Sequence, residues 1–147
     1  MTQAGEFTYR RIHRASRELL FDCMTQPAHL AGFWGPDGTT TPADGITVDL
    51  RPGGAFETVM VNVADGSRYT MRATYLDVRR PERIVWTEPD SGVTTTSTFR
   101  DLGGQRTELQ LRQANAPLGY HSPEARAGFA TSLDRFGAYL DKLGGSQ

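Results

Sequence analysis

The chain has 147 residues, of which 37% are hydrophobic and 22% charged, with a net charge of −1. Mean hydropathy is −0.48. This composition is typical of one globular domain over residues 1–147, and no apolar run approaches the ~20 residues that a transmembrane helix needs. The near-neutral charge argues against nucleic acid and anionic membrane surfaces as partners. The lack of a long apolar run argues against membrane insertion. Cys23 is the only cysteine and the first residues carry no secretory signal, so we expect a cytoplasmic protein.

A strand and two short helices are predicted at the start of the chain. Residues 7–13 alternate between apolar and polar side chains, which is typical of a strand. Ser16 is a good N-cap for a helix over residues 17–24. Pro27 at a first helical position begins a second helix that ends near Gly32.

Hairpins are predicted for the middle of the chain. A loop rich in Gly, Pro and Thr covers residues 35–45, and alternating segments bounded by turn signals follow it. We expect strands over residues 46–50, 55–62, 68–78, 83–88, 93–100 and 106–112. Because one hairpin follows another, the pattern favours an antiparallel meander.

A long helix is predicted from Ser122 or Pro123 to about Leu143. Apolar side chains recur along it at spacings of three and four, so they share one face that must be buried. These side chains are Phe129, Leu133, Phe136, Leu140 and Leu143. A curved antiparallel sheet closed by this helix can enclose a cavity in place of a solid core.

Several segments resemble a known family. They are Phe33-Trp34-Gly35-Pro36, the corner Asp49-Leu50-Arg51-Pro52-Gly53-Gly54, Pro81 to Thr87, Thr107 to Leu111 and the last helix. Together they resemble the Hsp90 ATPase activator homologue 1-like family of the START-like (SRPBCC) superfamily. The resemblance implies an α+β helix-grip fold, similar to Bet v 1, with two short helices after the first strand. It says little about function, because one such scaffold serves many functions.

A cavity wall is predicted from strand alternation and helix phase. Met, aromatic and Thr side chains fall on the faces expected to meet the last helix, a mixture typical of a small-molecule pocket. The predicted ligand-binding residues are Trp34, Phe56, Thr58, Met60, Tyr69, Met71, Trp86, Thr96, Phe129, Leu133 and Phe136. A solid core built from the same residues is the alternative. Trp34 either stacks on a ligand or plugs one end of the barrel.

No known catalytic motif is present. The sequence lacks the common nucleophile, zinc and phosphate-binding patterns, and His13, His29 and His121 lie in different predicted elements, so we expect no metal and no cofactor. A general acid or base could still come from Glu57, Tyr69, Tyr120 or His121 at a cavity rim, but no pattern selects a catalytic residue.

Three functions are therefore compatible with the sequence. The leading hypothesis is a binding protein, monomeric or homodimeric, that holds a small apolar or aromatic ligand between the sheet and the last helix. The second is a cofactor-independent cyclase or dehydratase acting on a polyketide-like or aromatic substrate. The third is a protein-binding, stress or chaperone-related module, which the family resemblance implies.

Overall fold

The computed structural model describes residues 5–117 and 121–144. These residues form three α-helices, one short 3-10 helix, η1, and eight strands. The helices are α1 (Arg17–Cys23), α2 (Pro27–Leu30), η1 (Ala43–Gly45) and α3 (Pro123–Gly144). The strands are β1 (Gly5–His13), β2 (Thr39–Thr40), β3 (Thr47–Val48), β4 (Ala55–Asn62), β5 (Arg68–Arg79), β6 (Arg83–Thr87), β7 (Thr94–Gly103) and β8 (Arg106–Ala116).

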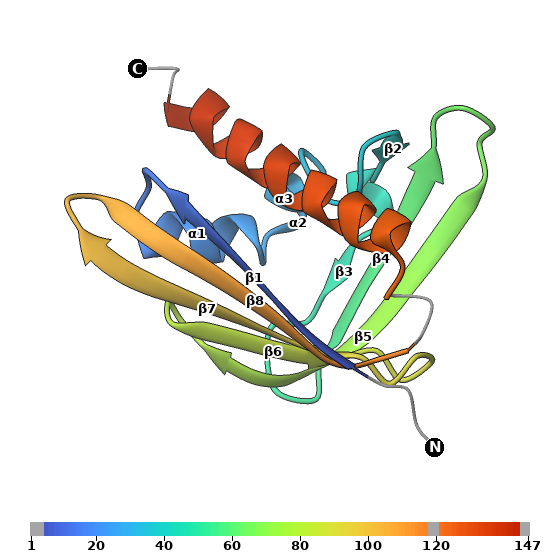
Figure 1. Ribbon diagram of the computed structural model, residues 1–147, viewed down its shortest axis with the longest axis horizontal. Coiled ribbons are helices and arrows are strands. Elements are labelled where there is room, and N and C mark those ends of the chain that lie inside the picture. The colour runs from blue at the N-terminus through green and yellow to red at the C-terminus, as the bar shows by residue number, and fades with distance from the viewer. Residues whose placement is uncertain (1–4, 118–120, 145–147) are drawn as a thin grey trace.

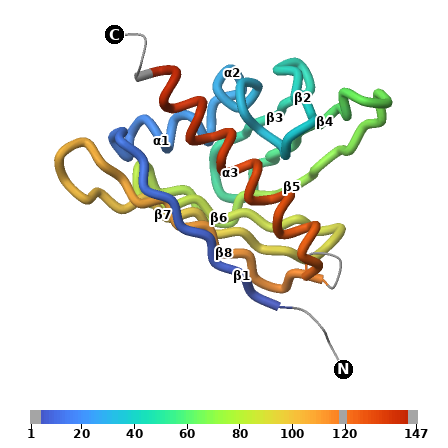
Figure 2. Tube along the Cα trace, turned by 45° about the horizontal axis from the view of Figure 1, so that its top comes forward, coloured from blue at the N-terminus to red at the C-terminus, as the bar shows by residue number. Residues whose placement is uncertain are grey.

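The strands form one antiparallel sheet that curves around the last helix. Its order is β1-β8-β7-β6-β5-β4-β2, and β3 pairs with β4 off this path. β4 to β8 are joined by successive hairpins, while β1 closes the other edge against β8. Helix α3 runs across the concave side, and α1 and α2 lie on that same side (Figures 1 and 2). The predicted α+β helix-grip fold is confirmed.

Helix α3 buries the face that the sequence predicts. Leu133, Phe136 and Leu140 are buried, and Phe129 and Leu143 are partly buried against the same core. The segment after α2 contributes as well, because the Phe33 ring packs on Phe136 with centroids 4.6 Å apart. This packing holds the helix against the sheet along much of its length.

The corner at residues 49–54 is built on a close backbone approach. A Cβ on Gly54 would lie 2.0 Å from the carbonyl oxygen of Asp49, so only glycine fits there. Gly53 has φ +85°, in the left-handed region that glycine adopts without strain. Asp49 and Arg51 form an exposed ion pair, with Nη2 2.9 Å from Oδ2. The corner is thus a structural element that turns the chain from β3 into β4.

The shortest strands differ from the prediction. Only Thr47–Val48 of the expected strand 46–50 pairs with a neighbour, and Thr39–Thr40 is a strand within the expected loop. Two-residue edge strands carry too little alternation to be recognised in a sequence. β8 continues to Ala116, four residues beyond its predicted end, through Asn115 at φ +60°.

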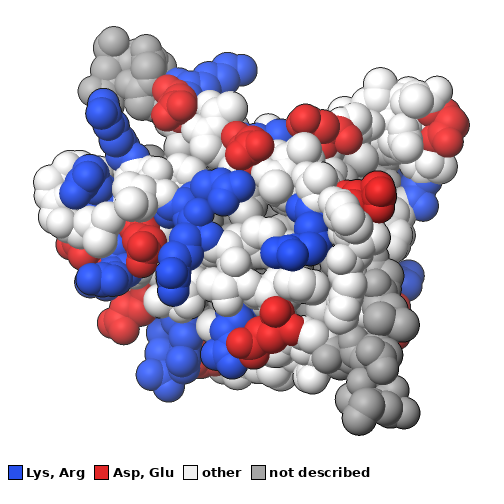
Figure 3. All heavy atoms as spheres, viewed as in Figure 1, with Lys and Arg blue, Asp and Glu red and all other residues white. Residues whose placement is uncertain are grey.

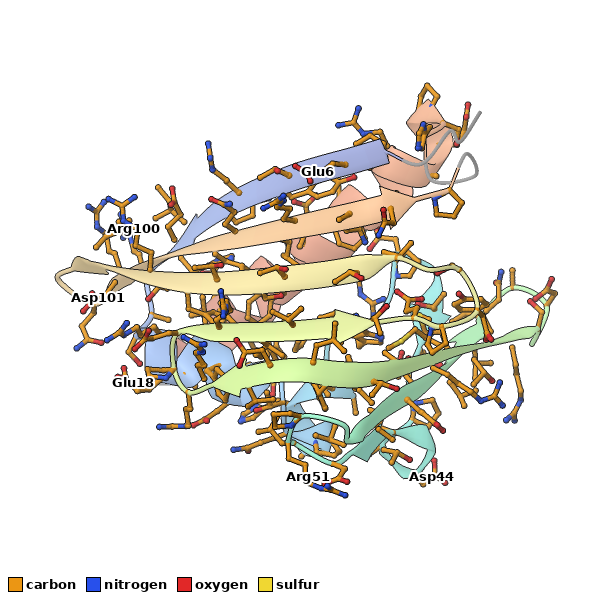
Figure 4. The ribbon with its side chains drawn as sticks, turned by 90° about the horizontal axis from the view of Figure 1, so that it is seen from below. Glu6, Glu18, Asp44, Arg51, Arg100 and Asp101 are labelled. Carbon is orange, nitrogen blue, oxygen red and sulfur yellow. The ribbon has the colours of Figure 1, made fainter. Side chains whose placement is uncertain are left out.

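Charged side chains cover the convex face of the sheet. Figure 4 views this face, with Glu6 on β1 and Arg100 and Asp101 near the end of the β7–β8 hairpin. Arg112 Nη2 lies 2.8 Å from Glu6 Oε2. On the face seen in Figure 3, basic and acidic side chains are interspersed. Within residues 5–117 and 121–144, no helix has the length and apolar character needed to cross a membrane.

Candidate ligand cavity

A cavity of about 200 Å³ lies between α3 and the concave face of the sheet. Its wall is mostly apolar and combines side chains of α3, of strands β4 to β8 and of the segment after α2. The lining residues are Met24, Phe33, Trp34, Gly35, Pro36, Met60, Tyr69, Met71, Trp86, Glu88, Thr95, Leu109, Leu111, Gln113, Phe129, Ser132, Leu133 and Phe136. A more open hollow of about 380 Å³ shares Pro36, Gln113, Phe129 and Ser132 with it, which places an entrance beside the first turns of α3.

Eight of the eleven predicted residues line this cavity. They are Trp34, Met60, Tyr69, Met71, Trp86, Phe129, Leu133 and Phe136. Tyr69 stands at the mouth, since it is 57% exposed, whereas Met71 and Trp86 are buried deeper in the wall. The strand phases of β4, β5 and β6 and the helix phase of α3 therefore bring these side chains together. Their binding of a ligand stays a prediction.

Phe56 and Thr58 lie behind the wall. Both are fully buried, and both contact Trp34. The Trp34 ring lines the cavity, whereas Phe56 and Thr58 do not. The Trp34 indole nitrogen donates a hydrogen bond to Thr58 Oγ1 at 3.1 Å, and its ring packs on Phe56 with centroids 5.3 Å apart. Trp34 is thus anchored to β4 and also forms part of the cavity surface.

Thr96 is on the wrong face of β7 to reach the cavity. The side chains of Thr95, Ser97 and Phe99 are buried, and those of Thr94, Thr96 and Thr98 alternate with them toward the convex side. Thr95 is the threonine that lines the cavity. The sequence held the signal: Phe99 belongs to the phase of Thr95, whereas the charged Arg100 belongs to the phase of Thr96.

Four polar residues of the wall were not predicted from the sequence: Glu88, Thr95, Gln113 and Ser132. Thr95 lies directly opposite Gln113 in the β7–β8 register, and Glu88 follows Trp86 by two residues, just past the end of β6. Gln113 continues the inward phase of Leu109 and Leu111, which could have identified it. Glu88 is the last residue of the predicted strand 83–88 and shares the inward phase of Ile84 and Trp86, so the same alternation could have identified it.

Burial raises the pKa of two groups that line the cavity, the Glu88 carboxyl and the Tyr69 phenol. It raises the pKa of the Glu88 carboxyl, and the neighbouring Asp90 carboxylate raises that pKa further. The pKa of the Tyr69 phenol is also raised, by burial first and then by Glu88 and Asp90. The part of the cavity beside these two groups therefore disfavours additional negative charge.

Of the three proposed acid or base residues that the structure describes, only Tyr69 reaches the cavity. Glu57 belongs to the opposite phase of β4 from Phe56 and Thr58. His121 lies outside the wall, with Nε2 2.9 Å from the Ala116 carbonyl oxygen. Tyr120 lies outside the described residues. Among the described residues, the carboxyl of Glu88 and the phenol of Tyr69 are the titratable groups that line the cavity.

The histidines and the cysteine occupy separate places. The His29 ring contacts the Tyr139 hydroxyl at 2.6 Å, and His13 packs edge-on against Phe136. Among the described residues, no three His, Cys, Asp or Glu side chains are arranged to hold a metal ion. Burial and the adjacent Asp22 raise the pKa of the Cys23 thiol to about 12, which keeps it protonated and unreactive.

A curved antiparallel sheet wrapped on a long C-terminal helix, with an apolar cavity between them, defines a helix-grip protein of the START-like class. Within this class, the chain belongs to the family of Activator of Hsp90 ATPase homolog 1-like proteins, whose model matches residues 14–141.

Solved structures agree with this assignment at the level of the fold. A protein from Chromobacterium violaceum is 24% identical, with TM-score 0.82 over 91% of this chain and 96% of its own. An AHSA1 protein from Silicibacter pomeroyi is 24% identical, with TM-score 0.79 over 95% and 99%. A protein from Rhodobacter sphaeroides is 18% identical, with TM-score 0.83 over 97% of both chains. A comparison with curated proteins finds no match.

Proposed function

We propose that this protein binds a small, largely apolar molecule in the cavity between the sheet and α3, without transforming it. The observation that supports the proposal is a cavity of about 200 Å³ whose wall is made mainly of aromatic, Met and Leu side chains. Protein interiors are normally packed without such voids, so an apolar cavity of this size is a candidate binding site.

The volume limits the ligand to a small one. Drug-sized ligands occupy pockets of roughly 300–1,000 Å³, whereas an engineered cavity of about 150 Å³ binds benzene. A cavity of about 200 Å³ therefore suits one aromatic ring with a short substituent. A longer molecule would have to extend into the more open hollow beside α3.

The alternative of a cyclase or dehydratase has weaker support. It requires a group that moves a proton on the bound substrate, and of the groups considered only Tyr69 and Glu88 are at the cavity. A chaperone-related role in protein binding rests on family membership alone.

The proposal is tested with propylbenzene as the ligand. It should raise the unfolding midpoint progressively as its concentration increases, because it binds only the folded state. Ser132→Phe should fill the cavity from α3 and abolish this rise, while Ala127→Phe, at an exposed position of the same helix, should retain it. Absence of any rise with the native protein up to the solubility limit of propylbenzene would contradict the proposal.

A further inference from the structure

The cavity has one polar region in its apolar wall, formed by Glu88, Thr95 and Gln113 and called here the polar corner. Thr95 is 1% exposed and Gln113 is 7% exposed. No hydrogen bond among the described residues involves these three side chains, and the fully buried unpaired polar atoms of this part of the chain belong to other residues, His13, Tyr75 and Ser97. The polar atoms of Glu88, Thr95 and Gln113 are therefore accessible from the cavity that they line. A polar group that enters the cavity can take the place of water on them.

The three side chains are close neighbours on the concave face. Thr95 and Gln113 are direct partners across β7 and β8, which places their Cβ atoms about 5 Å apart. Trp86 is the partner of Thr95 on the other side, and Glu88 follows Trp86 by two residues. The Glu88 amide donates to the Val93 carbonyl at 2.8 Å, so the β6–β7 ladder continues past Thr87 and keeps Glu88 in the phase of Trp86.

The chemistry of the polar corner selects a hydrogen-bonding group without negative charge. An amide and a hydroxyl can each donate and accept, while an ionised carboxylate only accepts. A ligand hydroxyl can donate to Glu88 and accept from Thr95 or Gln113. A ligand carboxylate would lie close to Glu88 and to the nearby Asp90. Burial and the Asp90 charge already raise the pKa of Glu88, so a further negative charge is disfavoured there. Fatty acids and other anions are therefore disfavoured.

We propose that the cavity takes a small phenol, a single ring with a short alkyl substituent, whose hydroxyl binds the polar corner while its ring and alkyl group contact the apolar wall. This inference rests on the proposed binding function and specifies its ligand class. It uses Met71, Trp86 and Phe129 for the apolar part of the ligand and Glu88, Thr95 and Gln113 for the polar part.

Matched ligands test the inference in the full-length protein. The dissociation constants of 4-propylphenol, propylbenzene and 4-propylbenzoate are measured by calorimetric or NMR titration. We expect 4-propylphenol to bind about fivefold to tenfold more tightly than propylbenzene, as for one net hydrogen bond. We expect 4-propylbenzoate to bind at least about tenfold more weakly than 4-propylphenol, because its charge meets Glu88.

Variants of the polar corner identify the groups responsible. Thr95→Val and Gln113→Leu should each reduce the ratio of 4-propylphenol affinity to propylbenzene affinity. Thr96→Val, one residue along β7 on the convex face, is the matched control and should change neither affinity. Glu88→Gln should narrow the difference in affinity between 4-propylphenol and 4-propylbenzoate.

The outcomes separate this inference from the function on which it rests. If propylbenzene binds and 4-propylphenol binds no better, the polar corner has no role in recognition and the phenol assignment is wrong, while the binding function stands. If 4-propylbenzoate binds most tightly, the assignment is also wrong. If none of the three ligands binds, both proposals are overturned.

Discussion

The indole nitrogen of Trp34 donates a hydrogen bond to Thr58 Oγ1 on β4, 3.1 Å away. Thr58 is fully buried on β4, and Trp34 comes from the segment after α2. This bond ties that segment to the sheet and orients one aromatic wall of the cavity. It explains how a residue outside the sheet and outside α3 helps to shape the site.

Trp34→Phe should destabilise the protein by about 1–3 kcal/mol, because it leaves the buried Thr58 hydroxyl without the indole donor. The free energy of unfolding is measured by chemical denaturation. Thr58→Val provides the second arm of a double-mutant cycle, and the two changes should be coupled by about 0.5–1.5 kcal/mol. Strict additivity of the two substitutions would show that the bond does not stabilise the fold.

Phe136→Ala should lower the free energy of unfolding by about 3–5 kcal/mol, since Phe136 is 2% exposed and packs on Phe33 and His13. Lys142→Ala, at an exposed position of the same helix, should change stability by less than about 0.5 kcal/mol. A loss below about 1 kcal/mol for Phe136→Ala would mean that the buried face of α3 is assigned wrongly.

Gly54→Ala should destabilise the protein by about 1–3 kcal/mol or more, because the added Cβ would meet the Asp49 carbonyl oxygen at 2.0 Å. Gly128→Ala is the control, since a Cβ there has no neighbour within 4 Å and the residue lies in a helix. This control should stabilise the protein by about 0.5–1 kcal/mol. Thermal unfolding of both variants decides the point, and equal midpoints would contradict the role of the corner.

Stability should fall as the pH drops below about 6.5, because burial lowers the pKa of His13. Arg11 lowers that pKa further, while Asp141 raises it. Between the lowered pKa of the folded state and the ordinary histidine value of 6.5, the unfolded chain binds more protons than the folded one, so stability rises with pH in that window. His13→Leu should flatten this part of the stability profile. Identical pH slopes for the native protein and the variant would show that His13 does not contribute.

The sequence predicted the fold because its strongest signals are long and periodic. The phase of α3 and the alternation along β4, β5 and β6 follow directly from the positions of Phe136, Met71 and Trp86. Three successive threonines and a serine obscured the phase of β7, which is why Thr96 was predicted in place of Thr95. That residues 1–147 form a single domain stays a prediction.

Strand phase could have placed the polar residues on the concave face, but their proximity to one another could not be predicted, because it depends on contacts between strands. Thr95 and Gln113 are 18 residues apart in the chain and become neighbours only through the β7–β8 register. Whether their side chains are satisfied depends on every neighbouring group, and spacing in a sequence does not report it. The volume left between α3 and the sheet likewise depends on the packing of the whole wall.

The most direct test of the binding proposal is an NMR experiment that detects contacts between the bound ligand and the side chains of the cavity wall. Met24, Met60 and Met71 all line the cavity, so ¹³C-methyl labelling of methionine places reporters on its surface. The proposal predicts nuclear Overhauser effects between propylbenzene protons and these methyl groups in the native protein, and their loss in Ser132→Phe. Saturating ligand that leaves all three methyl signals unshifted and without such effects would contradict a ligand-binding cavity between the sheet and α3.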